Sequence, residues 1–213
     1  MRQNPSFTLQ DPEELKRLIR ENPWATFVSS TAAGLVASHY PVVLDETRED
    51  ISILTHVGRP DELLHELGEH EVLMIIQGPH GYISPGWYET NRNVPTWNFI
   101  TAHFSGVPEL LSAEENYRVL GELVDHFERR MPEPRRMEHT PDEAAYAQRI
   151  SAGTVGVRLT PTRVVAKSKL SQNKPDSVVD TVIGHLEGDG AYAQPALAAE
   201  MRRAHDRIRA ARG

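Results

Sequence analysis

The chain of 213 residues contains no cysteine. This absence excludes disulfide bonds, thiolate metal sites, cysteine nucleophiles and haem ligated by a thiolate. It also favours a reducing compartment. The first residues, 1–5, are not followed by an apolar run, so no signal peptide is readable. We therefore expect a cytoplasmic protein.

Long apolar runs and an excess of positive charge are missing as well. The longest apolar stretch, residues 72–76, is far too short to span a bilayer. The net charge of −7 argues against broad nucleic-acid affinity, which depends on Lys and Arg neutralising phosphates. The arginines between residues 202 and 212 fit a solvated terminal helix, with a nucleic-acid contact as the alternative. No Ser-His-Asp arrangement, P-loop or zinc-type histidine pair is readable, which sets hydrolase and NTPase functions aside.

What is present is a mixed succession of strand and helix patterns. Capping residues and apolar stripes predict helices, and β-branched or alternating runs predict strands. The predicted helices cover residues 11–22, 60–67, 112–127 and 142–150, with two more after residue 175. The predicted strands cover residues 24–30, 35–44, 51–56, 71–77, 96–110 and 153–166. Residues 78–95 form a long loop, and loops of that length are usually functional.

Six strands that mostly follow one another predict an α+β fold, an antiparallel Greek-key barrel with peripheral helices. The hairpin formed by residues 24–44 argues against a doubly wound sheet. Pro41 places its second strand at an edge or a bulge. We expect a single domain over residues 1–213, with a helical C-terminal extension from about residue 175.

Three segments of unusual composition resemble the PaiB family, whose members are regarded as FMN-binding negative transcriptional regulators. The segments are Gln77-Gly-Pro-His-Gly-Tyr-Ile-Ser-Pro-Gly-Trp-Tyr88, Val94-Pro-Thr-Trp-Asn-Phe99 and Lys169-Leu-Ser-Gln-Asn-Lys174. They occur in the family's order, and the resemblance spans nearly the whole chain. It implies an FMN-binding split barrel in which two subunits of a homodimer share two sites.

One segment departs from the family pattern. Where family members commonly carry Ala-Arg-Ala-Asn-Pro, a segment suited to a flavin phosphate, this chain has Gly-Arg-Pro-Asp-Glu at residues 58–62. Two carboxylates oppose a phosphate, so FMN is disfavoured there. The chain also resembles the piperazate synthases, a PaiB-like branch that binds haem b, and His65 follows directly after the altered segment. The resemblance implies that His65 is the axial ligand of haem iron.

Other residues compete for that role or support it. His39, His56 and His103 each lie on a predicted strand and are alternative ligands. Arg59 suits either a flavin phosphate or a haem propionate, because a guanidinium binds both anions in bidentate fashion.

The remaining candidates lie in the three resembling segments. A flat ring and an amide at Trp97 and Asn98 suit a planar cofactor. Four polar residues end a hydrophobic strand, and we expect them to bind the cofactor: Ser171, Gln172, Asn173 and Lys174. Tyr82 and Ser84 are predicted substrate contacts from the second subunit. His80 and Lys174 are candidate catalytic residues; His80 suits proton transfer near neutral pH.

We therefore expect a haem-dependent piperazate synthase, which closes the small amino acid N5-hydroxy-L-ornithine into a ring by forming an N–N bond. Haem b is the expected cofactor and FMN the alternative. The alternative functions are an FMN-binding transcriptional regulator of the PaiB type and an FMN-dependent oxidoreductase. A membrane partner is not expected, and a nucleic acid is disfavoured.

Overall fold

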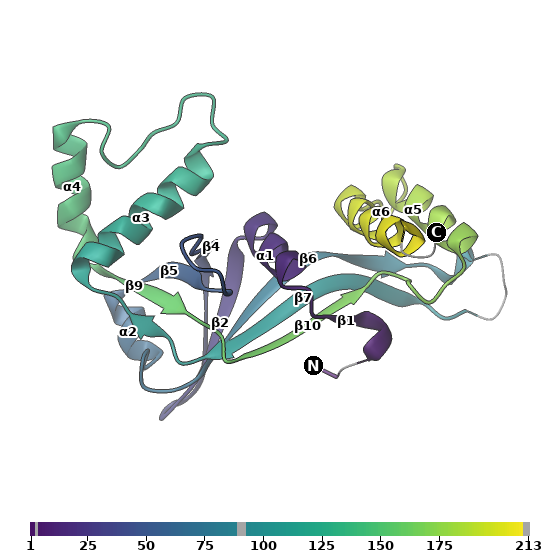
Figure 1. Cartoon of the computed structure of the whole chain (residues 1–213), viewed down its shortest axis with the longest axis horizontal. Helices are drawn as coiled ribbons and strands as arrows, with labels where there is room; N and C mark the ends of the chain where they lie inside the picture. Colours follow the sequence, from purple (N-terminus) through teal and green to yellow (C-terminus); the bar gives the residue numbers. More distant parts are fainter. Residues whose placement is uncertain (3, 89–92, 211–213) are drawn as a thin grey trace. The chain divides into compact units, whose positions relative to one another are not determined.

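The computed structural model describes residues 1–2, 4–88 and 93–210, and their strands form two antiparallel sheets (Figure 1). The six-stranded sheet has the order β1-β10-β7-β6-β2-β3, and the four-stranded sheet has the order β4-β5-β9-β8. The strands are β1 Thr8–Leu9, β2 Trp24–Thr31, β3 Gly34–Pro41, β4 Val43–Leu44, β5 Ile53–Gly58, β6 Val72–Ile83, β7 Thr96–Gly106, β8 Glu109–Leu110, β9 Thr154–Leu159 and β10 Arg163–Lys169. This arrangement confirms the α+β split barrel.

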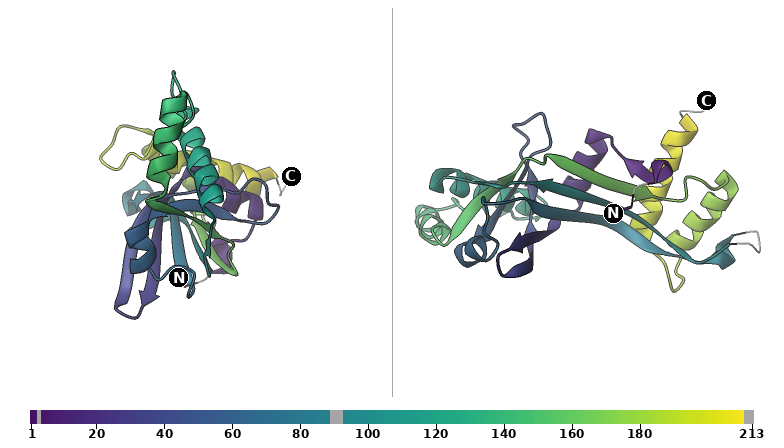
Figure 2. Two further views of the ribbon diagram at one scale, coloured as in Figure 1. Left: turned by 90° about the vertical axis from the view of Figure 1, so that its left-hand side faces the viewer. Right: turned by 90° about the horizontal axis from the view of Figure 1, so that it is seen from below.

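Six α-helices accompany the sheets in the described residues, and two short 3-10 turns precede β1 and follow β6. The helices are α1 Pro12–Glu21, α2 Arg59–Leu64, α3 Ala113–Glu128, α4 Pro141–Ser151, α5 Asp176–Glu187 and α6 Pro195–Ala210; the turns are Pro5–Phe7 and Pro85–Trp87. α3 packs against β5 and β9 and lies beside α4 (Figure 2). None of the helices in the described ranges is long and apolar enough to cross a membrane.

Three long strands predicted from the sequence are each two shorter strands. The pairs are β3 with β4, β7 with β8, and β9 with β10, and each pair has one strand in either sheet. A proline stands at every break: Pro41, Pro108 and Pro161. Because proline cannot donate a backbone hydrogen bond, it ends the ladder where the chain crosses to the other sheet. The prediction of six strands was therefore wrong.

The first hairpin is confirmed. β2 and β3 pair along their whole length, with Phe27 opposite Ser38. Gly34 closes the turn with a φ of 116°, which a side chain would oppose. β3 is the last strand of its sheet, as Pro41 predicted.

β6 runs on to Ile83, although a loop was predicted from residue 78. Burial alternates along the strand but shifts by one residue at Pro79 and His80, as at a bulge, where a proline is tolerated. Gly81 is needed by the packing: a Cβ there would lie 3.0 Å from Leu197 and 3.2 Å from Gln194.

The starts of α1 and α3 follow the predicted capping signals, while the end of α2 differs from its prediction. Asp11 caps α1, and Ser112 forms a capping box with Glu115 at the start of α3. α2 was predicted to reach residue 67, but it ends at Leu64 and His65 is its C-cap. His65 therefore leaves the helix at its end instead of standing within it.

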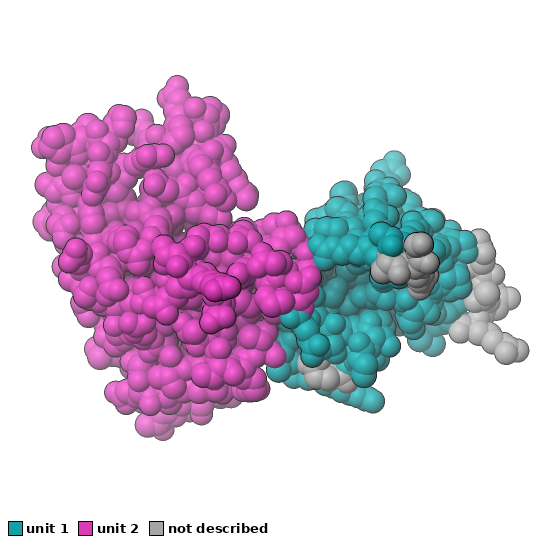
Figure 3. Space-filling model, in the orientation of Figure 1, with its two compact units in different colours: residues 1–10, 77–102, 165–213 teal, residues 11–76, 103–164 magenta. Residues whose placement is uncertain are grey.

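The chain divides into two compact units (Figure 3). Unit 1 comprises residues 1–10, 77–102 and 165–213, and unit 2 comprises residues 11–76 and 103–164. Each has a buried apolar cluster. In unit 1 it joins α5 and α6 to Ile83 and Leu170, and in unit 2 it joins α3 to β4 and β5. The expectation of one domain with a C-terminal extension stays a prediction.

Candidate functional site

Unit 1 brings together residues from the resembling segments. The side-chain amide of Asn98 on β7 donates a hydrogen bond of 2.9 Å to the hydroxyl of Ser171, which follows β10. Both side chains are buried. The amide oxygen of Asn98 has no partner among the described residues, although it is buried. Leaving a buried oxygen without a hydrogen bond costs free energy, so a ligand with a hydrogen-bond donor would be favoured at this position.

In the turn after β10, one of the polar side chains hydrogen-bonds to the backbone of the turn and of the strand before it. Ser171 has a φ of 66°, a left-handed conformation that is uncommon for a residue with a side chain. The Gln172 side chain accepts from the backbone nitrogen of Leu170 at 2.7 Å and donates to the carbonyl of Ser168 at 2.6 Å. Gln172 therefore braces the turn, while Asn173 is exposed. Cofactor binding by Gln172 and Asn173 stays a prediction.

Lys174 is held over an aromatic ring. Its ammonium lies 5.0 Å from the ring centroid of Tyr88 and donates to the side chain of Asn93 at 3.0 Å. Burial raises the pKa of Tyr88, against an opposing hydrogen bond from Ser171. Lys174 is thus oriented by cation–π attraction in a site that keeps Tyr88 neutral.

A row of four rings crosses the surface of unit 1. His80, Trp97, Tyr82 and Tyr192 follow one another, with centroid separations of 6.4, 6.3 and 4.8 Å. Trp97 and Tyr192 are each 54% exposed, so the row offers flat apolar surface to a ligand. Nδ1 of His80 lies 3.1 Å from the carbonyl of Gly78, which holds the ring against its own strand, β6.

Two lysines on β10 lie next to this row. Lys169 donates to the backbone carbonyl of Trp97 at 2.8 Å and to the hydroxyl of Thr96. The ammonium of Lys167 lies 5.6 Å from the ring centroid of Phe99. Burial and then the charge of Lys167 lower the pKa of Lys169. Neither lysine has a carboxylate partner in the part of the chain that the structure describes.

Next to the predicted substrate residues, unit 1 has a cleft of about 440 Å³. Ser84 and Trp87 line it, together with the loop after α5 that carries Asp189 and Tyr192. The Trp87 ring stacks on His185 at 4.9 Å with an angle of 11° between the planes. The cleft therefore presents flat rings and a carboxylate to a small ligand.

Lys167, His185 and Tyr192 were not singled out from the sequence, although they lie beside the predicted site residues in unit 1. Lys167 could have been predicted from the sequence. It lies two residues before Lys169, and alternation along a strand places both side chains on the same face. Nothing in the sequence singles out His185 or Tyr192, which reach the site only through the packing of α5 and α6.

The predicted iron ligand, His65, lies in unit 2. Its side chain is 1% exposed. Nδ1 lies 2.8 Å from the hydroxyl of Ser29, and Nε2 lies 2.9 Å from the hydroxyl of Ser38. Burial lowers the pKa of His65, although Asp61 opposes this. Both ring nitrogens are thus engaged by the protein, and the ring is neutral near pH 7.

The charged side chains of the altered segment before His65 are paired with other side chains of the protein. Arg59 pairs with Glu62 at 3.1 Å and donates to the carbonyl of Ala152 at 3.4 Å. The carboxylate of Asp61 accepts from the hydroxyl of Tyr40. Burial, followed by this hydrogen bond, raises the pKa of Tyr40 to about 12. Arg59 therefore already has an anionic partner.

The alternative histidine ligands also belong to unit 2. His39 is exposed on the edge strand β3 and stacks on Trp24 at 6.3 Å. Burial lowers the pKa of His56, and its Nδ1 has no partner among the described residues. Burial also lowers the pKa of His103.

The predicted site residues thus fall into two groups. Unit 1 contains His80, Tyr82, Ser84, Trp97, Asn98 and residues 171–174, whereas unit 2 contains His39, Arg59 and His65. Their assigned roles stay predictions. No cluster of three or more metal-ligating side chains occurs within the described ranges.

Comparison with known proteins agrees with this fold. The chain is 28% identical over 185 residues to "Protease synthase and sporulation protein PAI 2" of Bacillus subtilis, covering 86% of this chain and 87% of that protein. The structure is similar to the FAD and haem binding protein of Mycobacterium smegmatis, with a TM-score of 0.58, 17% identity and coverage of 81% and 78%. The flavocytochrome Anf3 of Azotobacter vinelandii gives a TM-score of 0.57, 16% identity and coverage of 76% and 69%.

At these identities the two solved structures support the fold alone. The relationship to the Bacillus protein confirms the resemblance to the PaiB family that the three segments predicted. Residues 1–163 match the family described as "Putative FMN-binding domain". The chain therefore belongs to this PaiB-type family of split-barrel proteins.

Proposed function

We propose that this protein is a homodimeric flavoprotein that binds FMN on the aromatic and cationic surface of unit 1. The observation that carries the proposal is the pair Lys167 and Lys169 on β10, next to the strand segment that carries the exposed Trp97. Lys169 donates to the backbone carbonyl of Trp97, and Lys167 lies over the ring of Phe99. Both cations lack a carboxylate partner among the described residues. A phosphate placed between them would relieve their repulsion, and a flavin ring stacks well on an indole.

The residues present fit such a group. Lys167 and Lys169 would hold its phosphate, and Trp97 and Tyr82 would contact its ring system. The cleft lined by Ser84 would take the substrate. FMN supplies one- and two-electron redox chemistry when bound, which makes an FMN-dependent oxidoreductase the enzyme class.

A regulatory role of the PaiB type is the alternative within the same cofactor proposal. The arginines of α6 give it little support as a nucleic-acid surface. Arg202 pairs with Glu187 at 2.7 Å and Arg209 with Asp180 at 2.9 Å, so part of their charge is already neutralised. Phosphate binding needs that charge.

Dimerisation is supported by uncovered apolar residues on the first hairpin. Trp24 is 62% exposed and Leu35 is 80% exposed, and the register places both on one face of the β2–β3 pair. Exposed apolar patches often mark interfaces between proteins. Leu35→Glu should shift the full chain toward monomer in sedimentation, whereas Ala33→Glu, in the exposed turn, should not.

Comparing FMN with riboflavin tests the proposed cofactor, because the two differ only in the phosphate. The wild-type chain should bind FMN at least about tenfold more tightly than riboflavin in a fluorescence-quenching titration. In the variant Lys167→Gln/Lys169→Gln this preference should disappear. Lys16→Gln is the matched control and should keep it, because Lys16 lies in unit 2 and pairs with Glu13. Equal affinity of the wild type for both compounds would contradict the proposal.

A second candidate is a haem-dependent piperazate synthase, which would cyclise N5-hydroxy-L-ornithine. It is favoured by the internal pairing of Arg59 with Glu62 and of Asp61 with Tyr40, which leaves residues 58–62 without a free cation for a flavin phosphate. His65 fits an iron ligand only if the Ser38 hydroxyl leaves Nε2, while Ser29 could retain Nδ1. Iron-ligating histidines usually keep such a second partner.

An absorption spectrum separates the two cofactors. The purified chain should show flavin bands if it binds FMN and a Soret band if it binds haem b. For the second candidate, His65→Ala should abolish the Soret band after haem is added, while Ser38→Ala should keep it. No Soret band in the wild type after reconstitution would exclude the synthase.

A further inference from the structure

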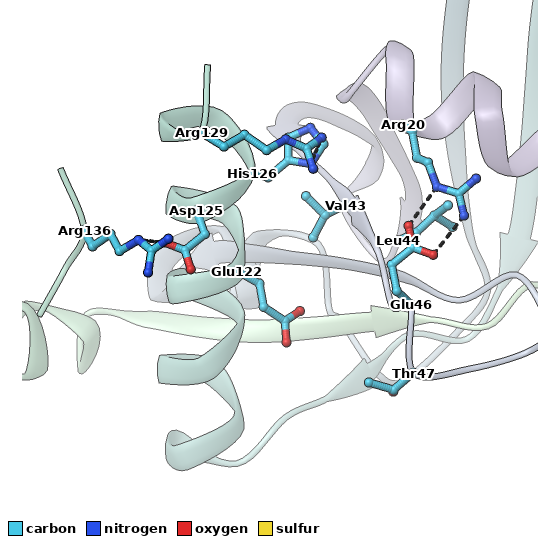
Figure 4. A pocket seen from close by; sticks show the side chains of 10 residues that line it. All are labelled: Arg20, Val43, Leu44, Glu46, Thr47, Glu122, Asp125, His126, Arg129 and Arg136. Carbon is cyan, nitrogen blue, oxygen red and sulfur yellow. Dashed lines mark hydrogen bonds and ion pairs between the residues drawn. The ribbon is translucent and has the colours of Figure 1, made fainter. Parts of the chain in front are cut away.

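A pocket of about 470 Å³ lies within unit 2, apart from every residue predicted to bind the cofactor (Figure 4). It is bounded by the last turn of α1, by β4 and the turn that follows it, by α3, and by the segment after α3. The lining residues are Arg20, Val43, Leu44, Glu46, Thr47, Glu122, Asp125, His126, Arg129 and Arg136.

The apolar part of the lining comes from β4. Val43 and Leu44 are 6% and 7% exposed, and Val43 belongs to the core cluster that includes Leu123 of α3. This part of the pocket is rigid because the core supports it. The rest of the lining is charged or polar.

Two of the three guanidinium groups in the pocket are already paired. Arg20 makes two hydrogen bonds to the carboxylate of Glu46, at 2.7 and 2.8 Å. Arg136 pairs with Asp125 at 3.3 Å. The first pair holds α1 to the segment after β4, and the second holds the loop after α3 to α3. Neither arginine is therefore free for a ligand.

Arg129 differs from both. It forms no ion pair with any residue in the described ranges, and its guanidinium donates to Nδ1 of His126 at 3.4 Å. Burial, followed by the charges of Arg129 and Arg130, lowers the pKa of His126, against the opposing charge of Glu46. A neutral imidazole therefore orients Arg129 without cancelling its charge.

We propose that this pocket binds a small monocarboxylate with an apolar body. The carboxylate lies on the guanidinium of Arg129, and the body lies on Val43 and Leu44. A phosphate dianion fits less well, because only one of the three lining guanidinium groups lacks an ion pair with the described residues, and the carboxylates of Glu122 and Asp125 line the same pocket. The site is independent of the proposed cofactor surface.

Phenylacetate is a suitable probe for the full chain, measured by titration calorimetry and by the NMR shifts of the His126 ring. We expect saturable binding to the wild type with a shift at His126. Arg129→Gln should weaken the affinity about tenfold or more, because a charge-assisted hydrogen bond contributes about 1.5 to 3 kcal/mol. Arg130→Gln is the matched control: it removes the neighbouring exposed cation, which does not line the pocket, and should change the affinity less than about twofold.

Two further probes decide the ligand class. Phenylacetamide, which has the same ring but no charge, should bind at least about tenfold more weakly than phenylacetate. Inorganic phosphate should not displace phenylacetate at equal concentration. Equal binding by wild type and Arg129→Gln, equal binding of the amide, or preference for phosphate would each overturn the proposal.

Discussion

The hydroxyl of Ser29 lies 2.8 Å from Nδ1 of His65, and the hydroxyl of Ser38 lies 2.9 Å from Nε2 of the same ring. Ser29 stands on β2 and Ser38 on β3, while His65 is the C-cap of α2. One imidazole therefore joins the end of a short helix to both strands of the first hairpin. His65 therefore has a structural role, and it could bind a cofactor only if one of these two hydrogen bonds were given up.

Ser29→Ala should destabilise the fold by about 1 to 3 kcal/mol, because it leaves Nδ1 of a buried ring without a partner. Urea unfolding of the full chain measures the change. Ser30→Ala is the control: its side chain is on the exposed face of β2 and should cost no more than about 0.5 kcal/mol. Equal effects of the two changes would contradict the bracing role of His65.

Arg158→Met should cost about 3 kcal/mol, since it removes the buried cation of the Asp45 carboxylate and leaves only the half-exposed Arg48, at 3.5 Å, to pair with it. Arg158 pairs with Asp45 at 3.2 Å and with Glu109 at 2.9 Å, and the side chains of Arg158 and Asp45 are 7% and 2% exposed. Thermal or urea unfolding measures the loss. The control is Arg163→Met, which breaks an exposed pair with Glu71 and should cost less than about 1 kcal/mol.

Adding Asp45→Asn to Arg158→Met should recover part of that loss, because the second change removes the buried charge that has lost its buried partner. Burial alone would raise the pKa of Asp45, but hydrogen bonds from Thr47 and Arg158 outweigh it and lower the pKa. No recovery in the double variant would mean that packing, not charge, determines the cost.

Two glycines should respond to alanine in opposite directions. Gly81→Ala should destabilise the protein by about 1 to 3 kcal/mol, since its Cβ would meet Leu197 at 3.0 Å. Gly121 lies inside α3 with nothing within 4 Å of the added Cβ, so Gly121→Ala should stabilise by about 0.5 to 1 kcal/mol. Urea midpoints decide, and the same sign for both changes would be inconsistent with the packing of α6 on β6.

His56 should make stability depend on pH below neutrality. Burial lowers its folded pKa from the usual value of about 6.5, so the unfolded chain takes up a proton first. The contribution of neutral His56 to the free energy of unfolding is complete above about pH 6.5. It is lost as the pH falls from there through the pKa of His56 in the folded chain. Unfolding free energies between pH 8 and pH 5 should therefore decline less steeply in His56→Leu than in the wild type. His139→Leu, at an exposed position, should keep the wild-type slope.

Local signals predicted most of the elements. Asp11, Ser112 and Thr140 accept hydrogen bonds from the first turns of α1, α3 and α4, and such caps depend only on residues close in the chain. The end of α2 was missed because Glu66 takes a φ of 48° there. Its side chain accepts from the backbone nitrogen of Ala32, a contact across 34 residues that no local signal contains.

The candidate site divides in the same way. The segments around Trp97 and Ser171 could be recognised from their composition, and their contact through Asn98 agrees with the expectation that they act together. That Gln172 would turn back onto its own backbone, or that Arg59 would pair with Glu62, could not be read from residue types. Whether a polar side chain binds a ligand or an internal partner depends on which groups lie within hydrogen-bond distance, and the folded chain sets those distances.

The family, the α+β class, the first hairpin and the starts of α1 and α3 could be predicted from residue order alone, because motif composition, alternation and capping are properties of neighbouring residues. The folded structure was needed to show where the long strands divide between two sheets and how His65 is held. It was also needed to show that Lys167, Lys169 and Arg129 have no carboxylate partner among the described residues. Those features depend on residues far apart in the chain, and burial sets their energy, since a charge or a ring nitrogen is costly only where water cannot reach it.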